Sequence, residues 1–399
     1  MIPYGKQSID QADIDAVIDV LQSDWLTQGP KVPEFEQKLC EYTGADRAVA
    51  VNSATSALHI ACLALDVGQG DIVWTSPNSF VASSNCALYC GASVDFVDID
   101  LDTGNMSIQA LTCKLMQAEQ QNQLPKVVIP VHFAGQSCDM KAIHQLSQQY
   151  GFTIIEDASH AIGGSFDEKK IGSCEYSDIC VFSFHPVKII TSAEGGAALT
   201  NNPELANRMA KLRSHGITGN TDEFTEPSHG VWYYQQQALG FNYRMTDLHA
   251  SLGVAQLTKV DTFVKVRNDL AKVYDKLFSD YPLITPLTCS NKVISAYHLY
   301  VVRLEKCTAE QHQFVVNALR EKGIYAHVHY IPIYLQPYYQ NIGFKVGSCK
   351  NAEAYYHGAV TLPLYPELTL AQQEYIVRTL SNLYSESVDT YESNGKNYE

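Results

Sequence analysis

Helix-like and strand-like segments alternate along residues 33–250, and no other feature limits the possible folds as strongly. The hydrophobic pattern predicts helices and strands in the order Glu34–Thr43, Ala48–Val51, Thr55–Leu65, Ile72–Trp74, Ser79–Tyr89, Val94–Val97, 107–119, Val127–Val131, Met140–Gln149 and Thr153–Glu156. A helix after each strand lets the next strand run in the same direction, so the sheet should be largely parallel. We therefore expect an α/β protein whose large domain has three layers, preceded by a helix at Gln11–Leu21.

A second region with a different pattern follows. The segment Leu252–Leu277 predicts one long helix, Leu299–Leu304 a strand and Gln311–Lys322 another helix. This order fits a smaller α+β domain. We therefore divide the chain into a large domain, a small C-terminal domain and a polar tail that we expect to be disordered, at residues 1–250, 251–384 and 385–399.

Composition limits the classes of function. The chain has 399 residues, of which 46% are hydrophobic and 18% are charged, as is typical of a globular protein with a sizeable core. Its formal net charge of −15 argues against general binding to nucleic acids or anionic membranes, because like charges repel. Eleven cysteines without a CxxC pair, no signal-like N-terminus and no long apolar run favour a soluble, cytoplasmic protein with free thiols.

One lysine, Lys188, stands in a mostly apolar stretch between two predicted core strands. Asp178–Ser183 has the pattern of a buried strand and Gly195–Thr200 that of another, so Lys188 falls in the connecting loop. Burial removes water from an ammonium group and lowers its pKa, which makes the neutral amine a nucleophile able to form a Schiff base. A lysine that reaches water along its flexible stem would have no such property, so other residues must decide.

The strand predicted at Thr153–Glu156 is followed directly by a second carboxylate, Asp157. In open α/β sheets ligands bind at the carboxyl ends of the strands, so Asp157 stands where a ligand would lie. A carboxylate there can keep the pyridine nitrogen of pyridoxal phosphate (PLP) protonated, as this cofactor requires to act as an electron sink. By itself, Asp157 could equally cap a helix or form a surface ion pair.

A phosphate-binding turn is predicted at the start of the helix that begins near residue 55. There a short strand turns through Ser53, Thr55 and Ser56 into an apolar helix. Free N–H groups at a helix N-terminus, with hydroxyl groups beside them, bind phosphate without a cation, although each hydroxyl could be a simple helix cap. Phe80 could stack on a planar ring, but a single aromatic residue is more often part of the core.

Together these residues resemble the DegT/DnrJ/StrS family of PLP-dependent sugar aminotransferases over nearly the whole chain. The resemblance rests on short motifs in the family's order, which are Leu26–Gly29, Asn52–Leu58, Pro77–Ala82, Glu156–His160, Phe182–His185 with Lys188, Glu194–Gly196, Arg213–Gly216, Asn242–Arg244 and Val328–Pro332. It implies the PLP-dependent transferase fold of the aspartate aminotransferase type, fold type I. Within the family, the motifs are most similar to those of the enzymes of pseudaminic acid biosynthesis.

The resemblance also implies roles for particular residues. Lys188 would be the catalytic residue that holds PLP as a Schiff base, with Asp157 at the pyridine nitrogen, Phe80 on the ring and His160 near the ring oxygen. The phosphate group would be bound by Thr55, Ser56, Ser183 and, from the neighbouring subunit, Asn242. The substrate pocket would comprise Tyr4, Asp24, Trp25, Leu26, Thr27, Ala54, Ser183, Asn242, Arg244, His327, His329 and Tyr330.

The reaction that the family implies is an amino transfer with ping-pong kinetics. L-Glutamate would give its amino group to the cofactor and leave as 2-oxoglutarate, and the amino group would then pass to C4 of a UDP-linked 4-keto-6-deoxy-N-acetylhexosamine. The active form would be a homodimer with shared active sites. Lys31, Arg213 and Arg244 are the candidates for contacts with the diphosphate.

Three other interpretations remain open. A nucleotide-sugar aminotransferase of the perosamine or aminoarabinose type would differ only in its pocket motifs. A PLP-dependent sugar dehydratase of the same fold carries histidine where Lys188 stands, so the lysine argues against that activity. A non-catalytic PLP-binding regulator is disfavoured by the presence of Lys188, Asp157 and the phosphate-binding turn in one chain.

The sequence also contains a closely spaced pair of histidines, a single histidine after a predicted strand, and a polar loop. His327 and His329 are spaced like residues on one side of a strand, which could suggest a metal site, but no acid or cysteine close in sequence completes it and we expect no metal. His132, after the strand predicted at Val127–Val131, is expected to be structural rather than catalytic. The polar segment 217–230 has no periodicity and predicts a mobile surface loop, either a plain connection or a lid.

Overall fold

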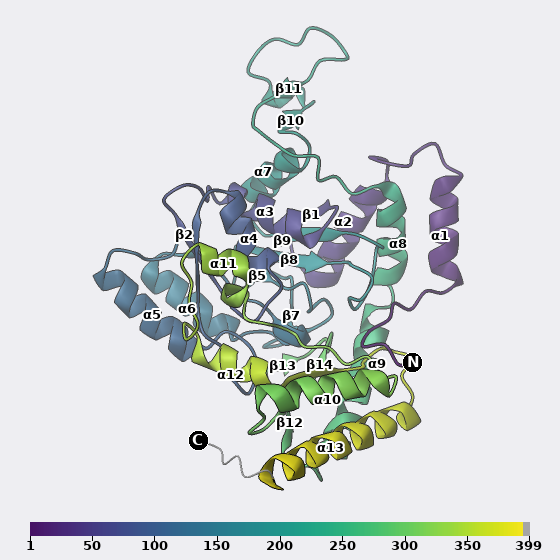
Figure 1. Cartoon of the computed structure of the whole chain (residues 1–399). Coiled ribbons are helices and arrows are strands. Elements are labelled where there is room, and N and C mark those ends of the chain that lie inside the picture. Colours follow the sequence, from purple (N-terminus) through teal and green to yellow (C-terminus); the bar gives the residue numbers. More distant parts are fainter. Residues whose placement is uncertain (394–399) are drawn as a thin grey trace.

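A seven-stranded sheet lies at the centre of the computed structural model, which describes residues 1–393 of the chain (Figure 1). In sheet order, the strands are β1 (Arg47–Val51), β9 (Gly196–Thr200), β8 (Ile179–Ser183), β5 (Thr153–Asp157), β4 (Val127–Ile129), β2 (Ile72–Thr75) and β3 (Ser93–Phe96). The strands from β8 to β3 are mutually parallel, whereas β9 is antiparallel to both of its neighbours. The prediction of a largely parallel sheet is confirmed.

Successive side chains on the central strands enter different hydrophobic cores, because they point to opposite faces of the sheet. On β5, Ile155 belongs to the core that contains α3 (Ala54–Ala64) and α4 (Ala82–Tyr89), whereas Ile154 belongs to a core on the other face. The side chains of β4 and β8 divide between the faces in the same way. The protein is therefore built in three layers, as the sequence predicts.

Further helices surround this sheet, the first of them packed on another helix, and most begin at a residue that can cap them. They are α1 (Gln11–Leu21), α2 (Lys31–Thr43), α5 (Ile108–Gln120), α6 (Met140–Tyr150), α7 (Pro203–Arg213) and α8 (Asp247–Leu257). The side chains of Asp10, Ser53 and Asp139 accept hydrogen bonds from free N–H groups in the first turns of α1, α3 and α6. Gly44 and Gly151 end α2 and α6 in the left-handed conformation that glycine adopts without strain.

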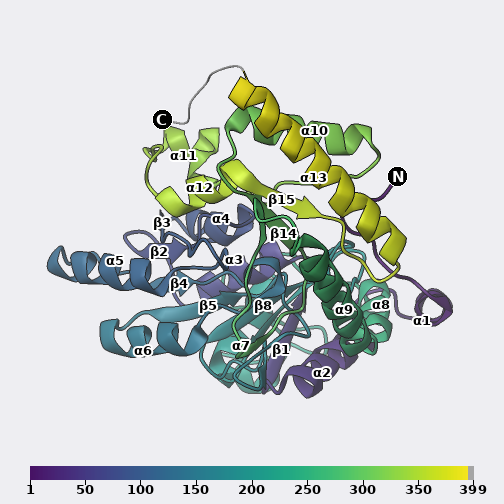
Figure 2. The ribbon, with the colours of Figure 1, turned by 90° about the horizontal axis from the view of Figure 1, so that it is seen from below.

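The C-terminal part of the chain forms a smaller α+β region on one side of the large sheet (Figure 2). Its antiparallel sheet and its main helices are β12 (Ile284–Pro286), β14 (Tyr300–Leu304), β15 (Ala359–Leu362), α9 (Val260–Phe278), α10 (Ala309–Glu321) and α13 (Leu370–Ser393). On β14, Val302 points into the core of this region, whereas Val301 packs into the core shared with α3 and α4. The small sheet therefore joins the two regions through its second face.

Shorter elements connect these parts. They are η1 (Phe133–Gly135), β6 (Ser165–Phe166), β7 (Lys169–Lys170), β10 (Ile217–Thr218), η2 (Thr221–Glu223), β11 (Gln235–Gln236), β13 (Val293–Ile294), η3 (Ile333–Leu335), α11 (Pro337–Asn341) and α12 (Lys350–Gly358). Residues 217–236, which we call the arm, stand away from the body of the molecule (Figure 1). The arm includes the predicted surface loop and exposes Val231, Trp232 and Tyr234 to solvent.

Two predictions about the second half of the chain are wrong. The single helix predicted at Leu252–Leu277 is two helices, α8 and α9, because each buries its apolar face against different partners: α8 packs on α1 and α2, whereas the later part of α9 enters the C-terminal core. The tail predicted to be disordered from residue 385 continues α13 as far as Ser393, anchored by the buried Tyr384, and residues 394–399 lie outside the described residues. The division predicted after residue 250 falls inside α8.

The cysteines of the protein are free thiols. All eleven cysteines lie in the described part of the chain and none forms a disulfide, as expected. Within residues 1–393, no helix is both long and apolar enough to cross a bilayer. Over the same residues, no cluster of three or more histidine, cysteine or acidic side chains could hold a metal ion.

Gly196 allows β9 to lie directly against the N-terminus of α3. A Cβ atom at this position would lie 2.5 Å from the backbone nitrogen of Ala54, far inside van der Waals contact. We predict that Gly196→Ala lowers the free energy of unfolding in urea by about 1–3 kcal/mol, as overpacked sites do. Gly219→Ala is the matched control, because a Cβ there meets no atom within 4 Å; equal stability losses in the two variants would contradict the prediction.

Candidate functional site

A cavity of about 350 Å³ lies at the carboxyl ends of β5 and β8, beside the N-terminus of α3. This is the edge of an α/β sheet at which ligands bind. The cavity is lined by many of the residues that the sequence predicts for the site. They are Tyr4, Ala54, Thr55, Phe80, Asp157, His160, Ser183, Lys188, His329 and Tyr330. Residues from both the large sheet and the C-terminal region therefore meet in one place.

Lys188 lines the cavity from the loop between β8 and β9. Burial lowers the pKa of its ammonium group to about 8, against the opposing attraction of the Asp157 carboxylate. At pH 7, a group with this pKa is neutral in about one molecule in ten, compared with fewer than about one in a thousand for lysine in water. The protein therefore supplies a nucleophilic amine at this wall of the cavity.

Asp157 is held in one orientation by three donors. Its Oδ2 accepts a hydrogen bond of 2.6 Å from the hydroxyl of Ser83 on α4, and its Oδ1 accepts bonds of 2.6 Å and 3.1 Å from the hydroxyl and amide of Ser159. The sequence interpretation missed both serines. The Asp-x-Ser spacing could have identified Ser159, since a serine hydroxyl two residues on often bonds back in a turn, whereas Ser83 depends on how α4 packs against β5.

Neutral aromatic and imidazole side chains form another part of the cavity wall. Burial lowers the pKa of His329 to about 3 and holds that of His160 well below its usual value, with a further contribution from the charge of Lys188. His329 Nδ1 lies 2.9 Å from the hydroxyl of Thr361, and the hydroxyl of Tyr330 lies 3.4 Å from His160 Nε2. His160 Nδ1 is buried without a hydrogen-bond partner, so a polar atom of a ligand could satisfy it.

The N-terminus of α3 faces the cavity through Ala54 and Thr55. The first N–H groups of a helix have no acceptor within the helix, so they are available to an anion. Ser56 does not line the cavity; its hydroxyl donates to Asn52 Oδ1 at 2.7 Å, and its backbone N–H donates to Ser53. A direct contact between the Ser56 hydroxyl and phosphate therefore remains a prediction that the cavity lining does not support.

Several predicted residues lie outside this cavity in a single chain, namely Asp24, Trp25, Leu26, Thr27, Asn242, Arg244 and His327. The segment of Trp25 and Leu26 lies beside the start of α8, where the backbone of Asp247 donates to Leu26. Asn242 is exposed at the end of the loop that follows the arm. His327 stacks on His329 with ring centroids 4.5 Å apart, so the two histidines share one side, as their spacing predicts.

A second, smaller cavity of about 180 Å³ contains two of the three candidate cations for the diphosphate. Arg213 and Arg244 line it, but Arg213 is ion-paired with Glu36 at 2.5 Å. Lys31 is likewise paired with Glu34, at 2.8 Å. Arg213 and Lys31 are therefore engaged with carboxylates, and Arg244 lines the smaller cavity rather than the main one.

His298 is a buried residue in contact with a side chain of the cavity wall, and the sequence interpretation missed it. It precedes β14, and its ring centroid lies 4.4 Å from that of His160. Burial lowers its pKa well below the usual value, so the ring is neutral. No local pattern could have placed it there, because the two histidines are far apart in the sequence and meet only when the C-terminal region packs on the large sheet.

Comparison with known proteins identifies relatives that match almost the full length of the chain. The model of the "DegT/DnrJ/EryC1/StrS aminotransferase family" matches residues 7–381. The chain is 37% identical to the UDP-4-amino-4,6-dideoxy-N-acetyl-beta-L-altrosamine transaminase of Campylobacter jejuni over 96% of this chain and 97% of that protein. It superposes on Helicobacter pylori PseC, an aminotransferase involved in the biosynthesis of pseudoaminic acid, with a TM-score of 0.88 and 33% identity over 96% and 99% of the two chains.

A third relative has been solved with and without its cofactor. The protein Spr1654 of Streptococcus pneumoniae is 31% identical to this chain in its PMP, apo and PLP forms. Its PLP form has a TM-score of 0.86 and covers 97% and 99% of the two chains, and its PMP (pyridoxamine phosphate) form has a TM-score of 0.88 over 98% and 99%.

The residues of the cavity fit PLP. Lys188 offers an amine of lowered pKa, Asp157 a fixed carboxylate, and the start of α3 free N–H groups for a phosphate. The unpartnered Nδ1 of His160 is a buried polar atom that the bound cofactor could satisfy. These groups are the ones that PLP chemistry requires of a protein.

The lowered pKa of Lys188 can be tested in the cofactor-free protein. Only the neutral amine reacts with amine-directed reagents, so labelling of Lys188 should rise with pH and reach half its maximal rate near pH 8. Competitive labelling followed by mass spectrometry of the peptide measures this rate. Lys188→Met is the control, because it removes the reactive amine and the corresponding peptide should carry no label. A midpoint at about pH 10, as for lysine in water, would show that burial does not lower the pKa of Lys188.

Proposed function

The chain belongs to the DegT/DnrJ/EryC1/StrS aminotransferase family, and from this membership we propose that it moves an amino group from L-glutamate to C4 of a UDP-linked 4-keto-6-deoxy-N-acetylhexosamine. Its class is established by the comparisons: it is a PLP-dependent sugar aminotransferase of fold type I, which acts on an amino donor and a keto sugar. The finer substrate is supported by the names of the transaminases that match nearly its whole length. The observation on which the catalytic proposal rests is the amine of Lys188 in one cavity with the Asp157 carboxylate.

Lys188 is proposed to act as both the anchor of the cofactor and the group that moves a proton. When bound, PLP supplies an electron sink that stabilises negative charge on the substrate carbon that loses its proton. Once the amino donor has displaced it, the Nζ of Lys188 is free and, with a pKa of about 8, can both accept and release a proton near neutral pH. The buried side chains of Phe184, Ile189 and Ile190 anchor the loop on both sides of Lys188 and would keep this atom in the cavity during both half-reactions.

Asp157 is proposed to face the pyridine nitrogen. Its carboxylate is buried and fixed by Ser83 and Ser159, so its charge is screened little by water. A fixed negative charge favours the protonated form of a nitrogen beside it. The three hydrogen bonds also occupy much of the carboxylate's accepting capacity, which keeps it from turning toward Lys188.

The neutral wall is proposed to receive the sugar. His329 and Tyr330 carry no charge at physiological pH, because burial disfavours their ionised forms, and His160, neutral for the same reason, keeps its proposed contact with the cofactor. A wall of neutral donors and acceptors suits the hydroxyl and acetamido groups of a sugar, which are polar but uncharged. Tyr4 lies at the same wall, with its ring centroid 5.5 Å from that of His329, and His327 beside it would contact the outer part of the substrate.

A homodimer is proposed because the site of one chain lacks some of its expected residues. Asn242, the expected phosphate ligand from the neighbouring subunit, is exposed and outside the cavity of its own chain. The arm that precedes it exposes Val231, Trp232 and Tyr234, which in water favours burial against another surface. A second copy that covers the arm could bring Asn242 and Arg244 to its partner's cavity.

The substrate proposal can be tested by following the visible absorbance of the PLP-loaded protein. L-Glutamate should change the spectrum, and the UDP-linked 4-keto-6-deoxy-N-acetylhexosamine should restore it and yield a product with an amine in place of the ketone, detected by mass spectrometry. Lys188→Ala should lower kcat by at least about a hundredfold, the usual scale for loss of a general acid-base group. A response to glutamate without a response to this sugar, but with one to a GDP-linked 4-keto sugar, would show that the proposed substrate is wrong.

Shared active sites can be tested by complementation between two inactive chains. Lys188→Ala removes the amine, and Asn242→Asp places a negative charge against the phosphate, so each homodimer should be inactive. In a heterodimer of the two, isolated through different tags, one site would combine the intact Lys188 of one chain with the intact Asn242 of the other. We expect about half the activity of the unmodified dimer. No activity in the purified heterodimer would contradict the sharing of residues between subunits.

A further inference from the structure

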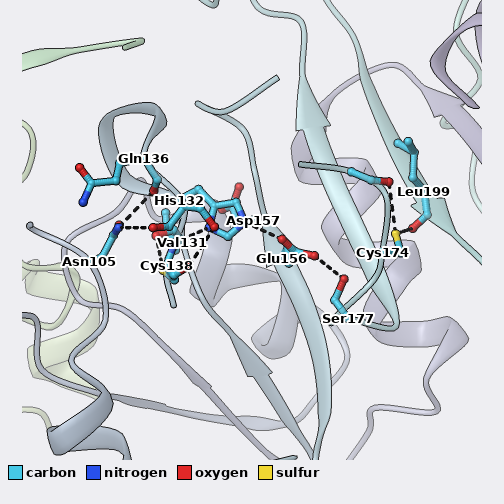
Figure 3. A network of polar contacts seen from close by, with 12 residues as sticks. Asn105, Val131, His132, Gln136, Cys138, Glu156, Asp157, Cys174, Ser177 and Leu199 are labelled. Carbon is cyan, nitrogen blue, oxygen red and sulfur yellow. Dashed lines mark hydrogen bonds and ion pairs between the residues drawn. The ribbon is translucent and has the colours of Figure 1, made fainter. Parts of the chain in front are cut away.

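Behind Asp157, on the opposite face of the sheet, the carboxylate of Glu156 connects three neighbouring parts of the chain (Figure 3). Its Oε2 lies 2.6 Å from Nε2 of His132, just after β4, and its Oε1 accepts a short hydrogen bond from Ser177, just before β8. Because Glu156 and Asp157 are successive residues on β5, their side chains point to opposite faces. One carboxylate therefore faces the cavity, and the other binds the strands that flank it.

His132 is itself fixed in orientation by its surroundings. Its Nδ1 accepts a hydrogen bond of 3.2 Å from the backbone N–H of Cys138, so the ring proton is on Nε2 and is donated to Glu156. The backbone of His132 also donates to the carbonyl of Asp157 at 3.0 Å, while the N–H of Asp157 donates to Pro130 at 2.9 Å. His132 is thus bonded to both carboxylate-bearing residues, to one through its side chain and to the other through its backbone.

The two central side chains of this network are buried, whereas Ser177 at its edge is partly exposed. His132 is 0% exposed and Glu156 is 5% exposed, and neither lines the cavity. A buried carboxylate costs free energy unless it is fully hydrogen-bonded, and apolar residues of similar volume often stabilise a core at least as well. A network of this kind beneath a functional strand end therefore suggests a role in orientation as well as in stability.

We propose that Glu156, held by His132 and Ser177, is a positioning residue that fixes the end of β5 and thereby aims the Asp157 carboxylate at the bound cofactor. The network ties the end of β4 and the beginning of β8 to the strand between them, so Asp157 cannot shift without breaking charge-assisted hydrogen bonds. This inference rests on the proposed role of Asp157. It assigns the pair of Glu156 and His132 a part in cofactor binding without contact with the cofactor.

The test compares variants by three readouts that do not depend on turnover. These are the dissociation constant for PLP, the pH at which the visible absorbance of the bound cofactor changes by half, and the Tm of the cofactor-free protein. Glu156→Gln removes the charge and one of the two accepting oxygens, and His132→Leu removes the imidazole donor. His132→Gln keeps an N–H donor in place of the imidazole. Asp157→Asn removes the carboxylate that faces the cavity and therefore shows how its loss changes each of the three readouts. Tyr274→Phe is the stability control, because it removes a buried hydrogen bond of 2.9 Å to Pro363 in the C-terminal core.

We expect Glu156→Gln and His132→Leu to weaken PLP binding by about tenfold, as expected for a misplaced charged hydrogen bond, and to move the spectral midpoint in the same direction as Asp157→Asn. His132→Gln should restore most of both properties. Tyr274→Phe should lower Tm and leave both properties unchanged. If Glu156→Gln does not fold, the comparison of His132→Gln with His132→Leu decides the question.

Two results would overturn the inference, and they differ in what they imply. If the Glu156 and His132 variants lower Tm but leave PLP affinity and the spectral midpoint unchanged while Asp157→Asn shifts them, the network only stabilises the core and the proposed role of Asp157 stands. If Asp157→Asn itself changes neither property, the proposed role of Asp157 fails, and the positioning role of Glu156 fails with it.

Discussion

The partial burial of Lys188 at the cavity wall, which lowers the pKa of its amine, is the constraint on which the rest of the site depends. The loop that carries Lys188 is anchored on both sides of this residue. Phe184 precedes Lys188, Ile189 and Ile190 follow it, and all three side chains are buried in the core that contains α2 and α8. With these apolar side chains on one face of the sheet, the lysine is left facing the cavity on the other. Desolvation then lowers its pKa to about 8, so the reactivity of the amine is a consequence of core packing.

A desolvated cation needs a compensating environment, and the cavity supplies one with few charges. Asp157 attracts the ammonium group and opposes part of the pKa shift. His160, His298 and His329 remain neutral in part because Lys188 is close to them, so the cavity does not accumulate positive charge. The site therefore combines a carboxylate fixed by hydrogen bonds, Asp157, with an amine that can change its charge near neutral pH, Lys188, and proton transfer to and from a bound cofactor requires groups of both kinds.

Local sequence patterns predicted most of what depends on strands and their ends. The alternation of helices and strands gave the three-layer α/β fold, and Asp157 and Lys188 were found because each stands beside a buried strand. The split between α8 and α9, the length of α13 and the contact of Ser83 with Asp157 depend on which distant surfaces pack together, and no local pattern records that. Asn242 and Arg244 could not be placed at the cavity for a further reason, since their proposed roles require a second chain.

The register of the sheet, in the end, connects the fold to the chemistry. Glu156 and Asp157 face opposite sides only because β5 is a regular strand between β4 and β8, and a shift of one residue would exchange the two carboxylates. The bonds from His132 and Ser177 act on Glu156 from both neighbouring strands, so they oppose such a shift at the point where it would matter most. A cofactor provides the reactive atoms of an aminotransferase, and what the protein adds is orientation. In this chain, that orientation begins on the face of the sheet that the cofactor does not touch.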